Sequence, residues 1–135
     1  MKTKKPGNLR VPVTHGLKDI YSMDMHLAYQ AACANQFNVV AFSRLAAAVS
    51  VVRSALEHHQ TSIPDALDTL NDAVNTLLIV RARGDETEKW EIRENELPSV
   101  LKGIEMAEQC IGTLDVTLLE QTAANLLQQI YGEHT

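Results

Sequence analysis

Residues 38–59 read NVVAFSRLAAAVSVVRSALEHH, a stretch with no glycine and no proline. Its large apolar side chains recur at helical spacing, and valines and alanines fill the positions between them as far as Arg53. A helix that is apolar on every face is normally buried on every face. We therefore expect a helix over 38–59 at the centre of a bundle or of a dimer. The residues of its regular apolar stripe are Phe42, Leu45, Val49, Val52 and Leu56.

Two interpretations of this helix stay open, and they differ in what covers it. In the first, it is the core helix of a single chain. In the second, it lies at the edge of the bundle, where its surplus apolar surface forms a homodimer contact or a groove for a partner helix. The residues expected at that dimer interface are Phe42, Leu45, Val49 and Val52.

Four more segments carry helical periodicity, at 17–34, 62–83, 97–111 and 115–132. Glycine and proline are scarce, which argues against a turn-rich β protein. Because the connections between five such helices are short, neighbouring helices should run in opposite directions. The sequence thus predicts an all-α fold, an antiparallel bundle of about five helices.

Capping residues mark the expected helix boundaries. Asn38 and Ser62 are good N-cap residues and should start the second and third helices. Gly84 suits the C′ position after the third helix, where a left-handed backbone is common. Gly112 is expected to end the fourth helix and Asp115 to begin the fifth.

The first fifteen residues differ from the rest of the chain. Pro6, Pro12 and Gly16 should keep this segment out of the first helix. Four basic side chains and no acidic one lie within the first ten residues. We expect a flexible basic segment over 1–15 and a single helical bundle domain over 16–135.

Charge and composition limit the function. The net charge is −5, and the chain after its tenth residue carries 8 basic against 17 acidic side chains. An acidic body repels phosphate backbones, so nucleic-acid binding is not expected outside the basic segment. The same charge permits an alternative function, an acidic nucleic-acid mimic that inhibits a basic partner protein. We find no run of about 18 apolar residues, and therefore expect a cytoplasmic protein without a membrane span.

Residues 84–96 form an acidic stretch around Trp90, the only tryptophan. The alternation at 89–93 permits a short strand, but no partner strand is evident, which favours a connector with Trp90 packed onto the bundle. Tryptophan is also enriched among the residues that dominate protein interfaces. The residues predicted to contact a protein partner are Trp90, Glu86, Glu88 and Glu91.

Residues 53–58 read RSALEH, with an arginine five positions before a histidine. This spacing resembles the catalytic motif of HEPN-domain ribonucleases, small helical bundles that dimerise with two motifs facing each other. The resemblance implies that Arg53 holds the scissile phosphate and that His58 acts in metal-independent acid–base cleavage. Ser54 stands where that family usually has asparagine. In the alternative interpretation, Arg53 and Glu57 form an i,i+4 surface pair and the chain has no catalytic residue.

The sequence predicts no metal site and no cofactor. The five histidines and two cysteines lack the spacing of metal ligands. Cys33 and Cys110 are interpreted as small buried hydrophobic residues in a reducing compartment. Neither a phosphate-binding glycine loop nor a serine elbow is present.

Four short stretches between residues 66 and 109 carry a second resemblance. They are ALDTLN at 66–71, EKW at 88–90, EL at 96–97 and Gln109. Together they are similar to small uncharacterised helical proteins of bacterial plasmids and prophages, which implies an accessory or regulatory role and no particular activity. The leading expectation is a non-enzymatic, homodimeric interaction protein that acts on a protein partner through helical surfaces.

Overall fold

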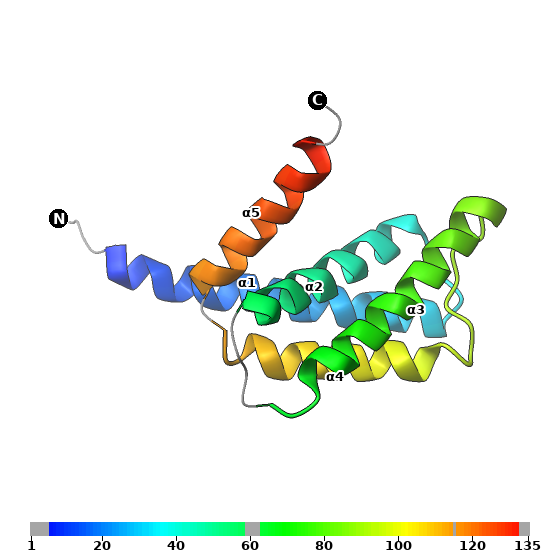
Figure 1. The fold of residues 1–135 in the computed structure, drawn as a ribbon, viewed down its shortest axis with the longest axis horizontal. Helices are drawn as coiled ribbons and strands as arrows, with labels where there is room; N and C mark the ends of the chain where they lie inside the picture. The colour runs from blue at the N-terminus through cyan, green and yellow to red at the C-terminus, as the bar shows by residue number, and fades with distance from the viewer. Residues whose placement is uncertain (1–5, 59–62, 115, 133–135) are drawn as a thin grey trace.

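The computed structural model describes residues 6–58, 63–114 and 116–132. These residues form five α-helices and no strand, which confirms the all-α helical bundle predicted from the sequence (Figure 1). The helices are α1 (Pro6–Cys33), α2 (Val39–His58), α3 (Ala66–Thr87), α4 (Leu97–Ile111) and α5 (Val116–Gly132).

α1 begins at Pro6 rather than at residue 17, so the prediction of a non-helical segment over 1–15 is wrong for residues 6–15. Pro6 is the first helical residue, where an N–H would have no partner within the helix. Pro12 lies further along, and its fixed φ is compatible with a helix. What it lacks is the N–H that would donate to the carbonyl of Asn8. Neither proline therefore interrupts α1.

The turn between α1 and α2 follows the sequence signals. Asn35 has a left-handed backbone with φ 58°, and the Gln36 N–H donates to the Ala31 carbonyl at 2.8 Å. The Asn38 side-chain oxygen accepts a hydrogen bond from the Ala41 N–H at 2.9 Å. Asn38 is therefore the N-cap of α2, as predicted.

α2 is the core helix of the single chain. It contacts all four other helices. Its apolar stripe is covered by them, with exposed fractions of 8% at Phe42, 0% at Leu45, 1% at Val49 and 0% at Val52. The other helices of the same chain cover these four residues, which favours the interpretation of α2 as a core helix. The dimer interface expected at Phe42, Leu45, Val49 and Val52 stays a prediction.

The hydropathy of α2 is high enough to raise the question of a membrane span. Among the described helices, Val39–Glu57 is the segment that is long and apolar enough to cross a membrane by length and composition alone, with a mean hydropathy of 1.6. The core helix of a soluble protein meets the same criterion. Because 44% of this segment is buried inside the fold, the observation is weak evidence for a membrane span.

Residues 88–96 connect α3 to α4 as a loop without a strand, as the connector interpretation predicted. α4 has the predicted bounds, but α3 continues to Thr87 and carries Gly84 in its interior. The left-handed residue that ends α3 is Glu88, with φ 63°. Gly84 is buried because the Trp90 ring lies directly on it. A Cβ atom at position 84 would be 2.6 Å from Cδ2 of Trp90.

Three aromatic rings meet beside this connector. The ring of Trp90 packs against Phe42 of α2, with 5.1 Å between ring centroids. Phe42 in turn makes an edge-to-face contact with Phe37 in the α1–α2 turn at 6.5 Å. The predicted packing of Trp90 onto the bundle is thus confirmed, and the aromatic trio Phe37, Phe42 and Trp90 joins the two connections.

α5 departs from the compact arrangement of the other four helices and projects away from them (Figure 1). Within the described residues it contacts α2 and α1 and no other helix. Leu119 near its start is fully buried, Ala123 and Leu126 are half-buried, and Leu127 is 54% exposed. The apolar stripe predicted for this helix is real, but only its first part is covered.

Replacing Gly84 with alanine tests the contact with Trp90. An alanine inside a helix normally stabilises it by up to ~1 kcal/mol relative to glycine. Here the added methyl group overlaps the indole ring, and we expect the free energy of unfolding to fall by about 1–3 kcal/mol. Urea denaturation followed by the fluorescence of Trp90 measures the change. Gly112→Ala is the control, because its Cβ would meet the Gln109 carbonyl at an ordinary 3.4 Å. Equal stability of both variants would contradict the packing described here.

Candidate interaction groove

An open groove of about 800 Å³ lies between α2 and α5. Its floor is a face of α2 made largely of small side chains, including Val39, Ala46 and Ala47. α5 forms one wall with Ala123, Leu126 and Leu127, and Tyr21 of α1 and Trp90 of the connector also contribute. We call this feature the α2–α5 groove. Of the buried stripe of α2, only Phe42 is among the residues that line it.

A smaller depression extends the groove between Val74, Leu77 and Leu78 of α3 and the same face of α2, with a volume of about 130 Å³. It shares Phe42, Ala46, Ser50 and Arg81 with the larger groove. The apolar surface is therefore continuous from α5 across α2 to the edge of α3. An exposed apolar surface of this kind normally marks a place of contact with another molecule.

Arg53 lies at the C-terminal end of the groove floor. Its Nη1 donates to Glu57 Oε1 at 2.5 Å and to Asn71 Oδ1 of α3 at 3.4 Å. Its Nε is buried and has no hydrogen-bond partner among the described residues. The i,i+4 pair predicted between Arg53 and Glu57 is thus confirmed. The His58 side chain lies outside the described part of the chain, so the ribonuclease-like pairing of Arg53 with His58 stays a prediction.

A second hollow of about 460 Å³ lies next to Arg53, on another face of α5. Its lining combines the Arg53–Glu57 pair of α2 with polar and apolar side chains of α5, which are Leu118, Gln121, Thr122, Asn125 and Leu126. The groove toward Trp90 is mostly apolar, whereas the hollow toward Glu57 is lined by both polar and apolar side chains.

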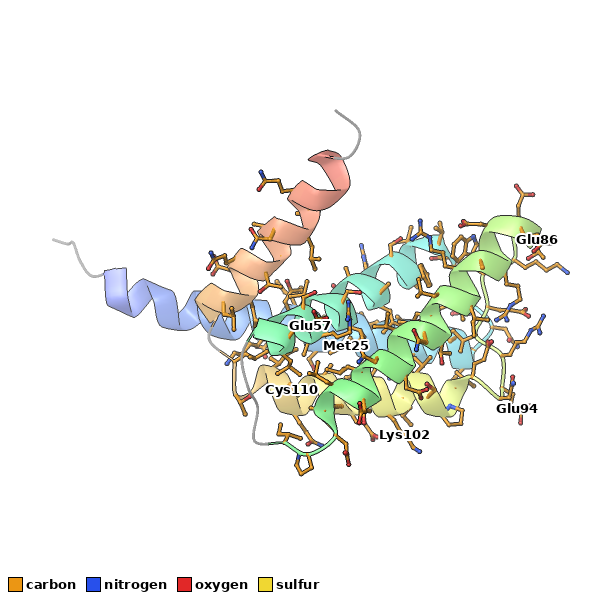
Figure 2. The ribbon with its side chains drawn as sticks, in the orientation of Figure 1. Met25, Glu57, Glu86, Glu94, Lys102 and Cys110 are labelled. Atoms are coloured by element: carbon orange, nitrogen blue, oxygen red, sulfur yellow. The ribbon has the colours of Figure 1, made fainter. Side chains whose placement is uncertain are left out.

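The residues predicted to contact a partner differ in their exposure to solvent. Trp90 is half-buried and helps to line the groove. Glu86, Glu88 and Glu91 are exposed. Figure 2 shows Glu86 and Glu94 projecting at the same end of the molecule, where α3 ends and the connector begins. The acidic side chains thus lie at the end of the bundle where Trp90 borders the groove.

A nearly buried ion pair fixes this connector. Arg83 of α3 donates to both Glu96 oxygens, at 2.7 and 3.0 Å, and to the Glu91 carbonyl at 3.0 Å. The Arg93 N–H also donates to Glu96 Oε1 at 2.8 Å. The hydrogen bond from Arg83 lowers the pKa of the Glu96 carboxyl below its ordinary value, although burial acts in the opposite direction. The sequence analysis did not predict this role of Arg83 in holding the connector.

Replacing Glu96 with glutamine tests this ion pair. The substitution leaves a mostly buried guanidinium without its counter-charge, and we expect a loss of about 2 kcal/mol in the free energy of unfolding at pH 7. Since the pKa of Glu96 is lowered by folding, its contribution is complete above about pH 4.5 and is lost as the pH falls further. The difference between wild type and Glu96→Gln should therefore shrink in acid. Glu94→Gln, on the exposed side of the same connector, is the control and should change stability little. A pH-independent difference would contradict the assignment.

One polar cluster joins α1 to α4. Ser22 Oγ donates to Glu108 Oε2 at 2.5 Å, and His26 Nε2 lies 2.9 Å from the same oxygen. Both side chains of α1 contact the same carboxylate oxygen of α4. Sequence spacing could not show this interhelical contact, because Ser22 and Glu108 are 86 positions apart.

The described residues contain no metal site, and their two cysteines differ in burial. Among them, no group of three or more histidine, cysteine, aspartate or glutamate side chains could hold a metal ion. Cys110 is buried as predicted, and burial raises the pKa of its thiol. Cys33 is exposed, so its interpretation as a buried residue is wrong; it follows Ala32, the last buried position of α1.

A scan against protein-family models, a search of curated proteins and a search of solved structures each found no match to this chain. The two resemblances drawn from short motifs therefore stay predictions.

Proposed function

We propose that this chain is a non-enzymatic interaction protein that binds a protein partner through the α2–α5 groove. The observation that carries the proposal is the groove itself, an open apolar surface of about 800 Å³ between two helices that diverge. Grooves of this form accept the apolar face of an amphipathic helix in other proteins. We further propose that the protein is a small cytoplasmic accessory or regulatory factor.

The composition of α5 supports this proposal. Seventeen residues of α5 include a single charged one, Glu120, although the helix projects from the body of the protein. α3 has six charged residues in twenty-two. Interface centres are depleted of charged residues, whereas solvated helix faces carry them. The low charge of α5 is thus typical of a helix that is covered by another molecule.

The polar border of the groove would orient the partner. Arg81 lies at this border, where its Nε is 3.7 Å from Asp85 Oδ2. Arg53 lies at the C-terminal end of the groove floor. Beyond them, the exposed glutamates 86, 88 and 91 provide an acidic rim next to Trp90. An apolar centre with a charged rim is the usual anatomy of a protein interface. We propose that Trp90 and these glutamates contact the partner at this end.

A photo-crosslinking side chain at position 47 tests the proposal in cells. Ala47 is exposed on the groove floor, so irradiation should join the chain to one or a few discrete proteins. A second substitution, Leu127→Glu, places a charge on the groove wall and should reduce that crosslinking at least tenfold.

Position 27 provides the matched control. Leu27 on α1 is 54% exposed, as is Leu127, but it does not line the groove. A crosslinker there should give none of the same products, and Leu27→Glu should leave crosslinking from position 47 unchanged. If position 47 yields no protein product, or the same products as position 27, the groove is not a binding site.

A further inference from the structure

We propose that α1 binds the surface of an anionic lipid bilayer through an exposed apolar stripe and the basic residues that precede it. This inference goes beyond the proposed function, because the residues of the stripe do not line the α2–α5 groove. It requires no helix that crosses the bilayer. A helix with an apolar face and basic residues can lie in the plane of the interface between the headgroups and the acyl chains.

The apolar stripe of α1 consists of Ile20, Met23 and Leu27, which are 56%, 60% and 54% exposed. Their spacing of three and four residues places them on one side of the helix. The bundle covers another side, where Met25 is fully buried. Because Met25 and Leu27 are two residues apart, they lie about 160° apart around the helix axis. α1 is therefore apolar on two sides, and the bundle leaves the stripe exposed to solvent.

The charge of the chain changes sign along α1. The first eighteen residues contain no acidic side chain and five basic ones, Lys2, Lys4, Lys5, Arg10 and Lys18. The remaining 117 residues carry 7 basic and 17 acidic side chains, a formal charge of −10. Asp19 and Asp24 lie beside the stripe, so the attraction to an anionic surface comes from the residues before them. Such a surface attracts the start of the chain and repels its body, which turns α1 toward the lipid.

The basic residues and the stripe belong to one continuous helix. α1 is helical from Pro6, and Figure 1 shows its N-terminal part extending past the other helices. In the sequence, Leu9 and Val13 continue the spacing of the stripe toward the N-terminus. The distance along the helix axis from Leu9 to Leu27 is about 27 Å. Apolar residues at this spacing, with basic residues among and before them, are typical of an interfacial helix.

The stripe favours a lipid surface over a nucleic acid as the partner. Basic residues alone suit the phosphate backbone of a nucleic acid. Contacts with phosphates, however, leave large apolar side chains such as Ile20 and Met23 without a role. A bilayer interface offers anionic headgroups and acyl chains together, so it accepts both parts of α1.

Sedimentation with unilamellar vesicles tests the inference on the purified full chain. Vesicles of phosphatidylcholine with about 30% phosphatidylserine should bind the chain at about 0.1 M salt. Vesicles of phosphatidylcholine alone should bind it at least tenfold more weakly. Replacing the four basic residues Lys2, Lys4, Lys5 and Arg10 with glutamine should weaken binding to the anionic vesicles by a similar factor. No binding to the anionic vesicles, or equal binding to both compositions, would overturn the inference.

Ile20→Glu tests the stripe, and Ile79→Glu is its matched control. Ile20 and Ile79 are 56% and 57% exposed, but Ile79 lies on α3, and both variants add one negative charge. A carboxylate at position 20 would be buried among acyl chains, so Ile20→Glu should weaken binding to anionic vesicles at least tenfold. Ile79→Glu should leave binding unchanged. Equal losses in the two variants, with both shown to be folded by circular dichroism, would contradict a role for the stripe.

A fluorophore distinguishes contact with the lipid from adsorption by charge alone. In a Cys33→Ser background, an environment-sensitive dye attached to Met23→Cys should shift its emission to the blue when anionic vesicles are added. The same dye attached to Ile79→Cys should not, and Cys110 is retained because it is buried. Binding to duplex DNA that Ile20→Glu leaves intact, with no dye shift on vesicles, would assign the basic residues to nucleic acid and overturn the inference.

The groove provides a final control. Leu127→Glu changes the wall of the α2–α5 groove and leaves α1 as it is. This variant should bind anionic vesicles as the wild type does, so the lipid contact and the proposed function fail independently. A loss of vesicle binding in Leu127→Glu equal to that in Ile20→Glu would contradict the assignment of the contact to α1.

Discussion

The covering of α2 sets the arrangement of the other helices. This helix presents aliphatic side chains around most of its circumference, so neighbours are needed on several sides. α1, α3, α4 and the start of α5 cover the stripe that contains Leu45 and Val52. The face that contains Val39, Ala46 and Ala47 stays open between the diverging α5 and the edge of α3. The groove is the part of α2 that four neighbours leave uncovered.

Much of this architecture could be predicted from local patterns. The N-cap at Asn38 follows from capping chemistry, and the bounds of α4 follow from apolar periodicity; both signals act within a few residues. The predicted end of α3 at Gly84 is wrong for a physical reason. A glycine after an apolar run has the same local signal whether it ends a helix or makes room for a ring, and the ring here comes from Trp90, six residues further on.

The candidate site was only partly accessible from the sequence. The apolar side chains around α2 indicated that several neighbours cover it, and α2 does contact all four other helices. Which residues remain exposed depends on the angle of α5, and no local pattern encodes that angle. A usable signal was nevertheless present, since residues 116–132 contain one charged side chain in seventeen. The contacts of Arg83 with Glu96, and of His26 with Glu108, depend on tertiary placement in the same way.

The aromatic trio links two connections that are separate in the chain. Phe37 lies in the turn before α2, Trp90 lies in the connector before α4, and Phe42 touches both rings. Neither connection can therefore change its length or path without disturbing the other. During evolution, insertions and substitutions at 34–38 should be inherited together with changes at 88–96. The two loops would then behave as one unit of covariation, although the whole of α2 and α3 separates them in the sequence.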